Sequence, residues 1–464
     1  MIVTALALLL ATPAAADSQT RVQAAGYKAA FLCSGVFNAG QTPRQVAADD
    51  LDGIYPEYQA LVGDMPYTLD RTRRTVSVTP GPALPSRVVA WRPLLGCSQL
   101  PVGGSDPALL PRLTPDFRAP NLARVDAARW PLGDAGAAMR LPRYQAAPLG
   151  RVVAEAFTPK FGGGNAGKPS TTAVIILKNG RIVAERYRAG YDRHTPQRTW
   201  SVAKSLTATL VGRAVQLGRI DVDAPAAIPQ WQGRGDPRRV ITTEQLLRMN
   251  SGLAAGPAGN RTDAVYVGGD TVTRTAAQMP LERPPGTHFN YANNDIMLAA
   301  LALETKLERR AKGSALGFPF TELLWPLGMT RTTPETDWQG HFVLSSQVWM
   351  TARDLARLAI LYENNGKASG KQLLPPDWRR FVSTPVGAQP TPVVPGRGGY
   401  GAGFWLFGKA DDMPEGSYAM LGNRGQFALI IPSRRIIVIR RGFDAPGENF
   451  DLLAFARAAL RTMK

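Results

Sequence analysis

Segments with the pattern of β-strands lie near the two ends of the C-terminal two-thirds of this 464-residue chain. Residues 172–177 and 181–186 are two apolar, β-branched runs joined by a Lys-Asn-Gly turn, which predicts a hairpin. Residues 426–431 and 435–439 predict a second pair of strands, and helical patterns fill the region between the pairs. The sequence therefore predicts an α+β fold, in which helices flank one antiparallel sheet and an all-helical subdomain is inserted between its early and late strands.

Composition divides the chain into four parts. Residues 1–16 are apolar and end in small residues, which predicts a signal peptide cleaved before Asp17. Residues 17–115 form a small N-terminal region to which the sequence assigns no chemistry, and residues 116–149 are a Pro- and Gly-rich linker. Residues 150–464 form the main domain, and nothing after residue 16 is apolar enough for a stable membrane span. We expect a periplasmic or secreted protein.

The chain has two cysteines, Cys33 and Cys97. In an oxidising compartment they are expected to form a disulfide, worth roughly 4 kcal/mol in the chain-entropy model. The alternative is a pair of buried free thiols, which behave as small apolar side chains.

A candidate nucleophile stands at the start of a predicted helix, in the run Ser201-Val-Ala-Lys204. Residues three apart lie on the same side of a helix, so the Lys204 amine is expected next to the Ser201 hydroxyl. A serine needs a base within hydrogen-bond reach to become a nucleophile, and an apolar helix face would favour the neutral amine by desolvation. The N–H group of Ser201 at the helix N-terminus is a candidate oxyanion donor. The alternative is an N-cap serine followed by a solvated lysine.

Two further stretches supply side chains or N–H groups of the kind that such a serine needs. In Tyr291-Ala-Asn293, a phenol and an amide two residues apart are able to face one cleft, where the phenol would pass a proton to a leaving group. Gly425 precedes an apolar strand and is expected to let the substrate approach closely, while the Gln426 N–H is expected to be a second oxyanion donor.

With these stretches in place, residues from about 150 to the end resemble the serine β-lactamase and penicillin-binding superfamily. The resemblance is strongest to the class C β-lactamase-like branch, which includes esterases, D-amino-acid peptidases and 6-aminohexanoate-dimer hydrolases. The motifs that carry it are Ser201-Val-Ala-Lys204, Leu246-Leu-Arg-Met-Asn-Ser-Gly-Leu253, Pro285-Gly-Thr-His-Phe-Asn-Tyr-Ala-Asn293, Pro326-Leu-Gly-Met329, Met350-Thr-Ala-Arg-Asp-Leu355 and Tyr400-Gly-Ala-Gly-Phe-Trp405. Their order and spacing match over about two-thirds of the chain.

The resemblance implies a serine hydrolase that acts on a small-molecule ester or amide through an acyl-enzyme. Ser201 is its nucleophile, Lys204 its base and Tyr291 its proton shuttle, and Asn293 falls at the asparagine of the family's Tyr-x-Asn motif. Two alternatives stay open: a β-lactamase or D-amino-acid peptidase, and a catalytically silent homologue that binds envelope ligands.

The family's Lys-Thr-Gly motif falls on Asn423, Arg424 and Gly425, which are therefore predicted to bind substrate. The lysine that pairs with a substrate carboxylate is absent, and a neutral hydrogen bond from Asn423 is weaker than a charge-assisted one. Successive strand residues point to opposite faces, so Arg424 is expected to face away from the cleft. We expect weak or no cleavage of penicillins and cephalosporins, and activity on esters or amides without an adjacent carboxylate.

Other classes of function have little support. The net charge is +18, but no run of five basic residues and no nucleic-acid-binding signature is present, so no nucleic-acid partner is expected. His194, His288 and His341 are scattered and no Gly-x-Ser-x-Gly motif exists, which disfavours a Ser-His-Asp triad. No metal-ligand spacing occurs, so neither a metal nor another cofactor is expected.

Overall fold

The computed structural model of the protein describes residues 17–114, 117–165, 168–255, 262–391 and 398–463. The predicted signal peptide, residues 1–16, lies outside the described residues.

The centre of the fold is a six-stranded antiparallel sheet with the strand order β14-β15-β16-β17-β7-β8. Its strands are β7 (Thr171–Lys178), β8 (Arg181–Tyr187), β14 (Trp405–Phe407), β15 (Ser417–Gly422), β16 (Gln426–Ile431) and β17 (Ile436–Gly442). The early hairpin joins the late strands where β7 pairs with β17, from Lys178 opposite Ile436 to Ala173 opposite Arg441. The predicted α+β sheet of early and late strands is therefore confirmed.

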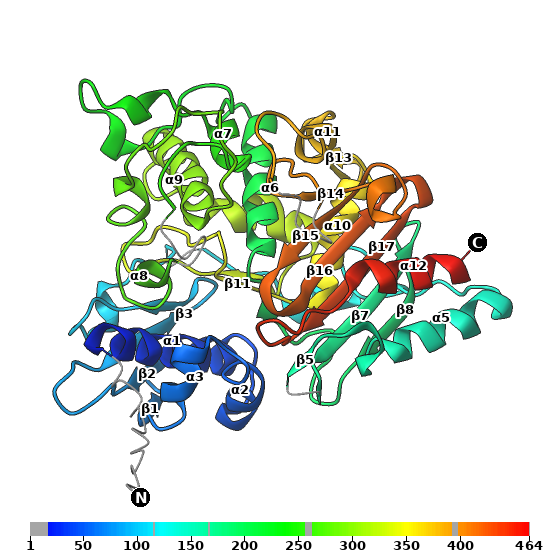
Figure 1. The fold of residues 1–464 in the computed structure, drawn as a ribbon, viewed down its shortest axis with the longest axis horizontal. Coiled ribbons are helices and arrows are strands. Elements are labelled where there is room, and N and C mark those ends of the chain that lie inside the picture. The colour runs from blue at the N-terminus through cyan, green and yellow to red at the C-terminus, as the bar shows by residue number, and fades with distance from the viewer. Residues whose placement is uncertain (1–16, 115–116, 166–167, 256–261, 392–397, 464) are drawn as a thin grey trace, which may run out of the picture.

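Helices cover both faces of this sheet (Figure 1). Helix α10 (Ala352–Glu363) packs on β16, β17 and β7, and α6 (Val202–Gln216) packs on β15. On the other face, α5 (Arg143–Glu155) packs on β8 and α12 (Leu452–Thr462) packs on α5. Every residue of β17 is buried because the strand is covered on both sides, and this explains the apolar run of residues 436–439 at its start.

The helical insertion lies beside the sheet, between β8 and β14 in the chain (Figure 1). Its main helix, α9 (Asn293–Arg310), packs against α6 and against α7 (Thr243–Leu247). The smaller elements of this part are α8 (Asp263–Tyr266), α11 (Trp378–Ser383), the sheet of β9 (Gln197–Arg198), β10 (Thr333–Pro334) and β11 (Val348–Met350), and the hairpin of β12 (Lys367–Ala368) and β13 (Lys371–Gln372). No helix in the described ranges combines the length and the apolar character that crossing a bilayer requires.

The N-terminal region is a separate small layer of helix on sheet. Its elements are α1 (Ser18–Phe37), α2 (Pro43–Asp49), α3 (Pro56–Val62) and a four-stranded sheet of β1 (Tyr67–Asp70), β2 (Thr75–Val78), β3 (Arg87–Arg92) and β4 (Gly96–Gln99). The expected disulfide is present, because Cys33 on α1 is bonded to Cys97 on β4, and the two thiols are not free. The region also shares the core of the main domain: the ring of Phe31 lies 5.9 Å from that of Trp200 and 6.5 Å from that of Trp349.

The predicted linker, residues 116–149, contains regular structure in its described part. Helix α4 (Leu122–Ala127) lies within it, and α5 starts at Arg143 and runs past the predicted boundary at residue 150. Pro148 lies inside α5. A proline in the second turn removes one backbone hydrogen bond without preventing the helix from packing on β8 and α12. After α5 the chain forms a short hairpin, β5 (Gly164–Asn165) and β6 (Lys168–Pro169), before β7.

Candidate active site

Ser201 stands where the chain turns from β9 into α6. Strand β9 is fixed by pairing with β11, where Arg198 lies opposite Trp349. Trp200 then adopts a left-handed backbone with a φ of 49°, a conformation that costs a non-glycine residue on the order of 1 kcal/mol. Ser201 occupies the N-cap position of α6, but its side chain makes no capping hydrogen bond. The alternative of a capping serine is therefore wrong, and the hydroxyl is available for other contacts.

The Lys204 amine lies within hydrogen-bond distance of this hydroxyl. Its Nζ lies 3.0 Å from the Ser201 Oγ, 2.6 Å from the Asn293 Oδ1 and 2.8 Å from the Ser345 carbonyl oxygen. Only 1% of Lys204 is exposed, and no salt bridge to a described carboxylate compensates its burial. Burial lowers the pKa of the Lys204 amine to about 7.

These three contacts match the hydrogen-bonding capacity of a neutral amine. A neutral amine has two N–H groups and one lone pair. Asn293 Oδ1 and the Ser345 carbonyl are acceptors only, so they take the two N–H groups. The lone pair is then left for the hydroxyl proton of Ser201. The arrangement suits an amine that removes a proton from Ser201.

Tyr291 lies in the segment just before α9, and Asn293 is the first residue of that helix. The Tyr291 ring centre is 5.1 Å from the Lys204 Nζ. The ring is held by the neighbouring rings of Tyr400, at 5.8 Å, and Trp405, at 5.3 Å. The structure thus brings Ser201, Lys204, Tyr291 and Asn293 together, as the family resemblance implied.

The backbone beside Ser201 comes from Gly422, at the end of β15, and not from Gly425. A Cβ added to Gly422 would lie 2.2 Å from the Thr199 carbonyl oxygen and 3.3 Å from the Ser201 nitrogen. A Cβ added to Gly425 would instead lie 1.6 Å from the Arg440 Nη1. Gly425 lines the cavity, but the close backbone approach to Ser201 is made by the glycine three residues earlier.

Gln426 is also displaced from its predicted role. It lies on β16 opposite Gly422, and it is not among the described residues that line the cavity at Ser201. Its buried side chain donates to the Gly442 carbonyl oxygen at 2.5 Å and accepts from the Arg441 Nε at 2.7 Å. The physical reason is that α6 packs on β15, so β15 rather than β16 borders the nucleophile.

Arg424 has a left-handed backbone in the turn between β15 and β16. Although it borders the cavity, its guanidinium donates to the carbonyl oxygens of Asp50, Asp52, Phe443 and Asp444. These bonds tie the turn to the N-terminal region. Asn423, at the start of the turn, lines the same cavity and presents no charge.

A cavity of about 910 Å³ opens at Ser201. Three parts of the chain form its walls: the N-terminal region with Tyr27 and Tyr55, the elements around the nucleophile, and the start of α12 with Leu452 and Leu453. No local pattern in the sequence indicated that the N-terminal region reaches the site. Tyr266 was also missed; its hydroxyl lies 2.6 Å from the Ser345 Oγ, next to the carbonyl that binds Lys204. The signal for both was weak, because isolated tyrosines far from a motif do not indicate a site.

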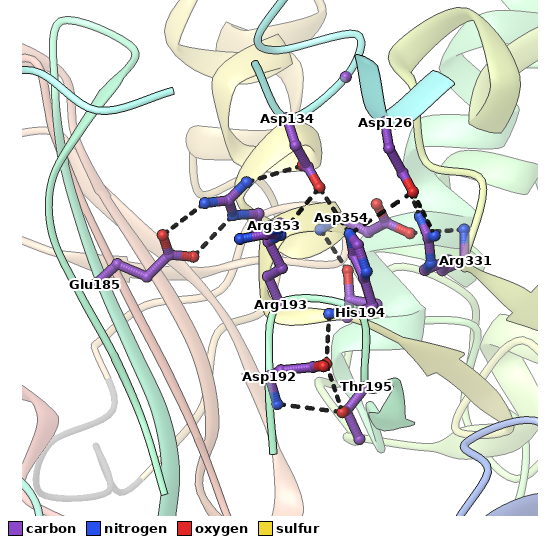
Figure 2. A network of polar contacts seen from close by, with 12 residues as sticks. Asp126, Asp134, Glu185, Asp192, Arg193, His194, Thr195, Arg331, Arg353 and Asp354 are labelled. Carbon is purple, nitrogen blue, oxygen red and sulfur yellow. Dashed lines mark hydrogen bonds and ion pairs between the residues drawn. The ribbon is translucent and has the colours of Figure 1, made fainter. Parts of the chain in front are cut away.

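One cluster of possible metal ligands occurs in the described part of the chain, and it lies elsewhere (Figure 2). Its members are Asp126, Asp134 and His194. Arg331 binds both oxygens of Asp126, at 2.7 and 2.8 Å, and Arg353 lies 2.9 Å from Asp134. Burial would raise the pKa of Asp134, but hydrogen bonds from His194 and Arg353 hold it well below its usual range. The cluster is an ion-pair network that joins the predicted linker to α10, because the arginines already neutralise its carboxylates.

The histidines do not form a catalytic triad with Ser201. His194 belongs to the network of Figure 2, and the His341 Nδ1 lies 2.8 Å from a Glu304 oxygen. The described residues that line the cavity include no histidine.

Comparison with known proteins is consistent with this geometry. The sequence model of the Beta-lactamase family matches residues 163–440, which is more than half of the chain. A 6-aminohexanoate-dimer hydrolase of Paenarthrobacter ureafaciens is 27% identical over 230 residues, covering 46% of this chain and 57% of that protein. The chain thus matches less than two-thirds of the length of this curated relative.

Two solved structures have the same fold. A penicillin-binding protein homologue from Caulobacter crescentus has a TM-score of 0.55 at 18% identity, over 70% of this chain and 99% of that one. EstCE1, a hydrolase with promiscuous acyltransferase activity, has a TM-score of 0.52 at 16% identity, over 68% of this chain and 98% of that one.

Proposed function

This chain belongs to the beta-lactamase family of hydrolases, and on that basis we propose that it cleaves an ester or amide through an acyl-enzyme on Ser201. The observation that carries the proposal is the position of the Lys204 Nζ, 3.0 Å from the Ser201 Oγ and held by two neutral acceptors. A buried amine in this position is a base that does not need a histidine.

The first half of the reaction transfers the acyl group to the enzyme. The Lys204 amine takes the hydroxyl proton of Ser201 while Oγ forms a bond to the carbonyl carbon of the substrate. The bond between that carbon and the alcohol or amine then breaks, and the leaving group takes a proton through the Tyr291 phenol, which the Lys204 ammonium resupplies. In the second half, water replaces the leaving group, and the acid is released with Ser201 restored.

The oxyanion of the tetrahedral intermediate needs two N–H donors in this scheme. We assign them to Ser201, at the start of α6, and to Asn423, the residue after Gly422. This replaces Gln426, because Gly422 and not Gly425 borders the Ser201 nitrogen. Donors fixed by a helix end and by a strand end need no rearrangement when the charge develops.

The residues on the Asn423 side of the cavity favour ester or small amide substrates over β-lactams. Asn423 lines the cavity there and presents no charge, and Arg424 is bound to four carbonyl oxygens. The 6-aminohexanoate-dimer hydrolase and the hydrolase with acyltransferase activity named above make amides and esters the first substrates to test.

The proposal extends to the place of action and the parts of the chain. Export to the periplasm or beyond is supported by the Cys33–Cys97 disulfide, which forms and persists in oxidising compartments. We further propose that the N-terminal region, residues 17–115, is a wall of the substrate cavity, since Tyr27 and Tyr55 line it. The catalytic unit then corresponds to the predicted main domain with α5 included.

The decisive experiment combines turnover with covalent labelling. The purified protein should hydrolyse p-nitrophenyl acetate or butyrate, D-amino-acid amides or linear amide oligomers, and should hydrolyse nitrocefin weakly or not at all. A fluorophosphonate should label Ser201, as found by peptide mass spectrometry. Ser201→Ala should lose labelling and turnover while keeping its thermal unfolding temperature, because the hydroxyl is not a helix cap.

Each other outcome identifies a different function. An adduct on another residue would overturn the mechanism. Nitrocefin turnover above that of the esters would favour a β-lactamase or D-amino-acid peptidase. A folded protein that neither labels nor turns over any of these substrates would favour a silent ligand-binding homologue.

A further inference from the structure

Arg198 is a second cation at the Ser201 cavity, and the proposed reaction has no use for it. It is the last residue of β9, three residues before Ser201, and it lines the cavity although only 6% of it is exposed. Its Nη2 donates to the Ser346 Oγ at 3.1 Å, and the neighbouring Ser345 carbonyl accepts from Lys204. Adjacent Cα atoms lie about 3.8 Å apart, so one short segment holds both cations near the nucleophile.

The guanidinium of Arg198 has unused hydrogen-bonding capacity. A guanidinium carries five N–H donors, and the bond to Ser346 is the one that Arg198 makes to a described residue. Its Nε is buried without an acceptor, and no described carboxylate lies within ion-pair distance. Arg424, the other arginine that lines the cavity, is in contrast bound to four carbonyl oxygens. A buried cation without a partner in the protein is costly unless a ligand supplies the anion.

None of the described acidic groups near Arg198 forms an ion pair with its guanidinium. Asp50 and Glu335 feel its charge, but neither lies within ion-pair distance, and Glu335 accepts from the Ser34 hydroxyl at 2.6 Å and the Cys97 N–H at 3.1 Å. Asp263 and Asp451 also line the cavity, but both have protein partners. The Tyr58 hydroxyl donates to Asp263 at 2.7 Å, and the Ala454 N–H donates to Asp451 at 2.8 Å.

Three aromatic rings fix the orientation of the guanidinium. Its central carbon lies 4.2 Å from the centre of the Trp200 ring, 4.8 Å from that of Phe31 and 5.7 Å from that of Tyr266. Such stacking holds the planar group in place and keeps water away from it. A prepositioned, poorly hydrated guanidinium is suited to a carboxylate, which it binds through two parallel N–H donors.

We propose that Arg198 binds a carboxylate of the substrate, so that the hydrolysed ester or amide is an anionic one. This inference rests on the proposed function, because it names the substrate class of the same site. The carboxylate lies on the β9 wall, beside Trp200 and the N-terminal region, and not at Asn423, where a β-lactam carboxylate is expected. The site therefore combines poor β-lactam cleavage with a preference for acidic substrates.

The test compares charged substrates with neutral ones of the same shape. One pair varies the acyl side, the p-nitrophenyl monoester of glutarate against p-nitrophenyl pentanoate. The other varies the leaving group, 3-acetoxybenzoate against 3-acetoxybenzamide. In at least one pair the charged substrate should have a kcat/KM higher by about tenfold or more, the scale of a hydrogen bond to a charged group. The preference should appear mainly in KM and weaken as salt is added.

Variants assign that preference to Arg198. Arg198→Gln should reduce the ratio of the charged to the neutral kcat/KM to about one, because only the charged substrate has a group for the guanidinium. Arg198→Lys should restore part of the ratio, since it keeps the charge without the planar fork. Arg274→Gln is the matched control, because it removes the same charge from an arginine whose side chain is 71% exposed, and it should keep the wild-type ratio.

A wild-type ratio near one in both pairs, or an equal loss on both substrates in the variants, would overturn the inference and leave Arg198 a structural residue. Binding measured by calorimetry on Ser201→Ala separates this result from a failure of the proposed function. Monomethyl glutarate should bind more tightly than dimethyl glutarate, and adding Arg198→Lys should weaken that difference. This comparison tests carboxylate binding even if the protein hydrolyses none of the substrates.

Discussion

Two basic residues flank Ser201 at equal distances in the sequence, and their surroundings give them opposite chemistry. Lys204, three residues after it, is buried among neutral acceptors, so burial lowers the pKa of its amine to about 7. Arg198, three residues before it, is also buried, and its planar guanidinium presents N–H donors in a fixed fork. The first position is the proposed base, and the second is the proposed carboxylate-binding group.

The pH dependence of kcat/KM should follow the Lys204 amine. The neutral form is the active one, so activity should be low when the amine is protonated, rise through a pKa of about 7 and then level off. Lys204→Arg, which stays charged, should lose about 10³-fold or more in kcat/KM, as Lys204→Ala should, because a general base contributes on the order of 10² to 10⁴.

Stopped-flow or plate assays of a neutral ester between pH 5 and 10 measure this profile, with circular dichroism to show that each variant is folded. A rising limb near the ordinary lysine pKa of about 10.4 would show that burial does not neutralise Lys204. Substantial activity in Lys204→Arg would remove Lys204 as the base.

At the scale of elements, β15, β16 and the turn between them form the edge of the site next to Ser201. The sequence predicted β16 and β17 because their residues are β-branched and apolar, but it missed β15 (Ser417–Gly422). That strand contains Ala, Met and Gly, whose intrinsic preference for strands is low, and it forms because it lies between β14 and β16. Because β15 was not predicted, the glycine beside Ser201 was assigned to Gly425, three residues after the correct one, Gly422.

Gly422 should accordingly be the sensitive glycine for activity. In Gly422→Ala, the new methyl group would collide with the Thr199 carbonyl oxygen and push β15 away from Ser201. We expect kcat/KM to fall about 10²-fold or more, the usual effect of losing one oxyanion donor, with a small change in unfolding temperature. Gly150→Ala is the matched control: its Cβ meets nothing within 4 Å on α5, so activity should be unchanged.

Gly425→Ala should behave differently from Gly422→Ala. Its Cβ would overlap the Arg440 guanidinium, which pairs with Asp444 at 2.7 Å in the core, so the free energy of unfolding should fall before catalysis is affected. Equal effects of the two substitutions on kcat/KM per folded molecule, measured with active-site titration, would contradict the assignment of Gly422.

The sequence predicts those parts of the site that depend on local spacing, but not those formed by contacts between residues far apart in the chain. The spacing within Ser201-Val-Ala-Lys204 and within Tyr291-Ala-Asn293 is local, and these motifs also carried the family resemblance, so this cluster was predicted before any contact was known. Tyr27 and Arg198 reach the cavity through contacts between distant parts of the chain. No local pattern marks such contacts, so neither residue was predicted to be part of the site.

At the scale of the whole molecule, the cavity is shared by two structural units. The N-terminal region contributes Tyr27 and Tyr55 to its wall, and Phe31 packs against Trp200 next to the nucleophile. The disulfide between Cys33 and Cys97 joins the helix and the sheet of that region. Stability of the N-terminal region and shape of the substrate site are thus linked.

Loss of this disulfide should lower both stability and activity. Cys33→Ala with Cys97→Ala should reduce the free energy of unfolding by roughly 4 kcal/mol, the chain-entropy value for a loop of this size. The value of kcat/KM should fall in parallel, because the wall that holds Tyr27 loosens. Thermal unfolding with and without a reductant measures the effect, and the double variant, which has no disulfide, should not respond to the reductant.

Non-reducing peptide mapping of the exported protein completes this test, since it should recover Cys33 and Cys97 in one linked peptide pair. Two free thiols there would contradict the disulfide and weaken the proposal of export. A wild-type protein whose melting is unchanged after full reduction would show that the bond contributes little to stability.

The hydrogen bonds of Arg424 couple the N-terminal region to the turn beside Ser201. Its guanidinium holds the carbonyl oxygens of Asp50 and Asp52 in the N-terminal region, while its own backbone follows Asn423 in the turn after β15. Any outward swing of the N-terminal region therefore pulls on the turn beside Ser201. The wall of the cavity formed by the N-terminal region and the turn beside Ser201 are thus mechanically coupled through the side chain of one arginine.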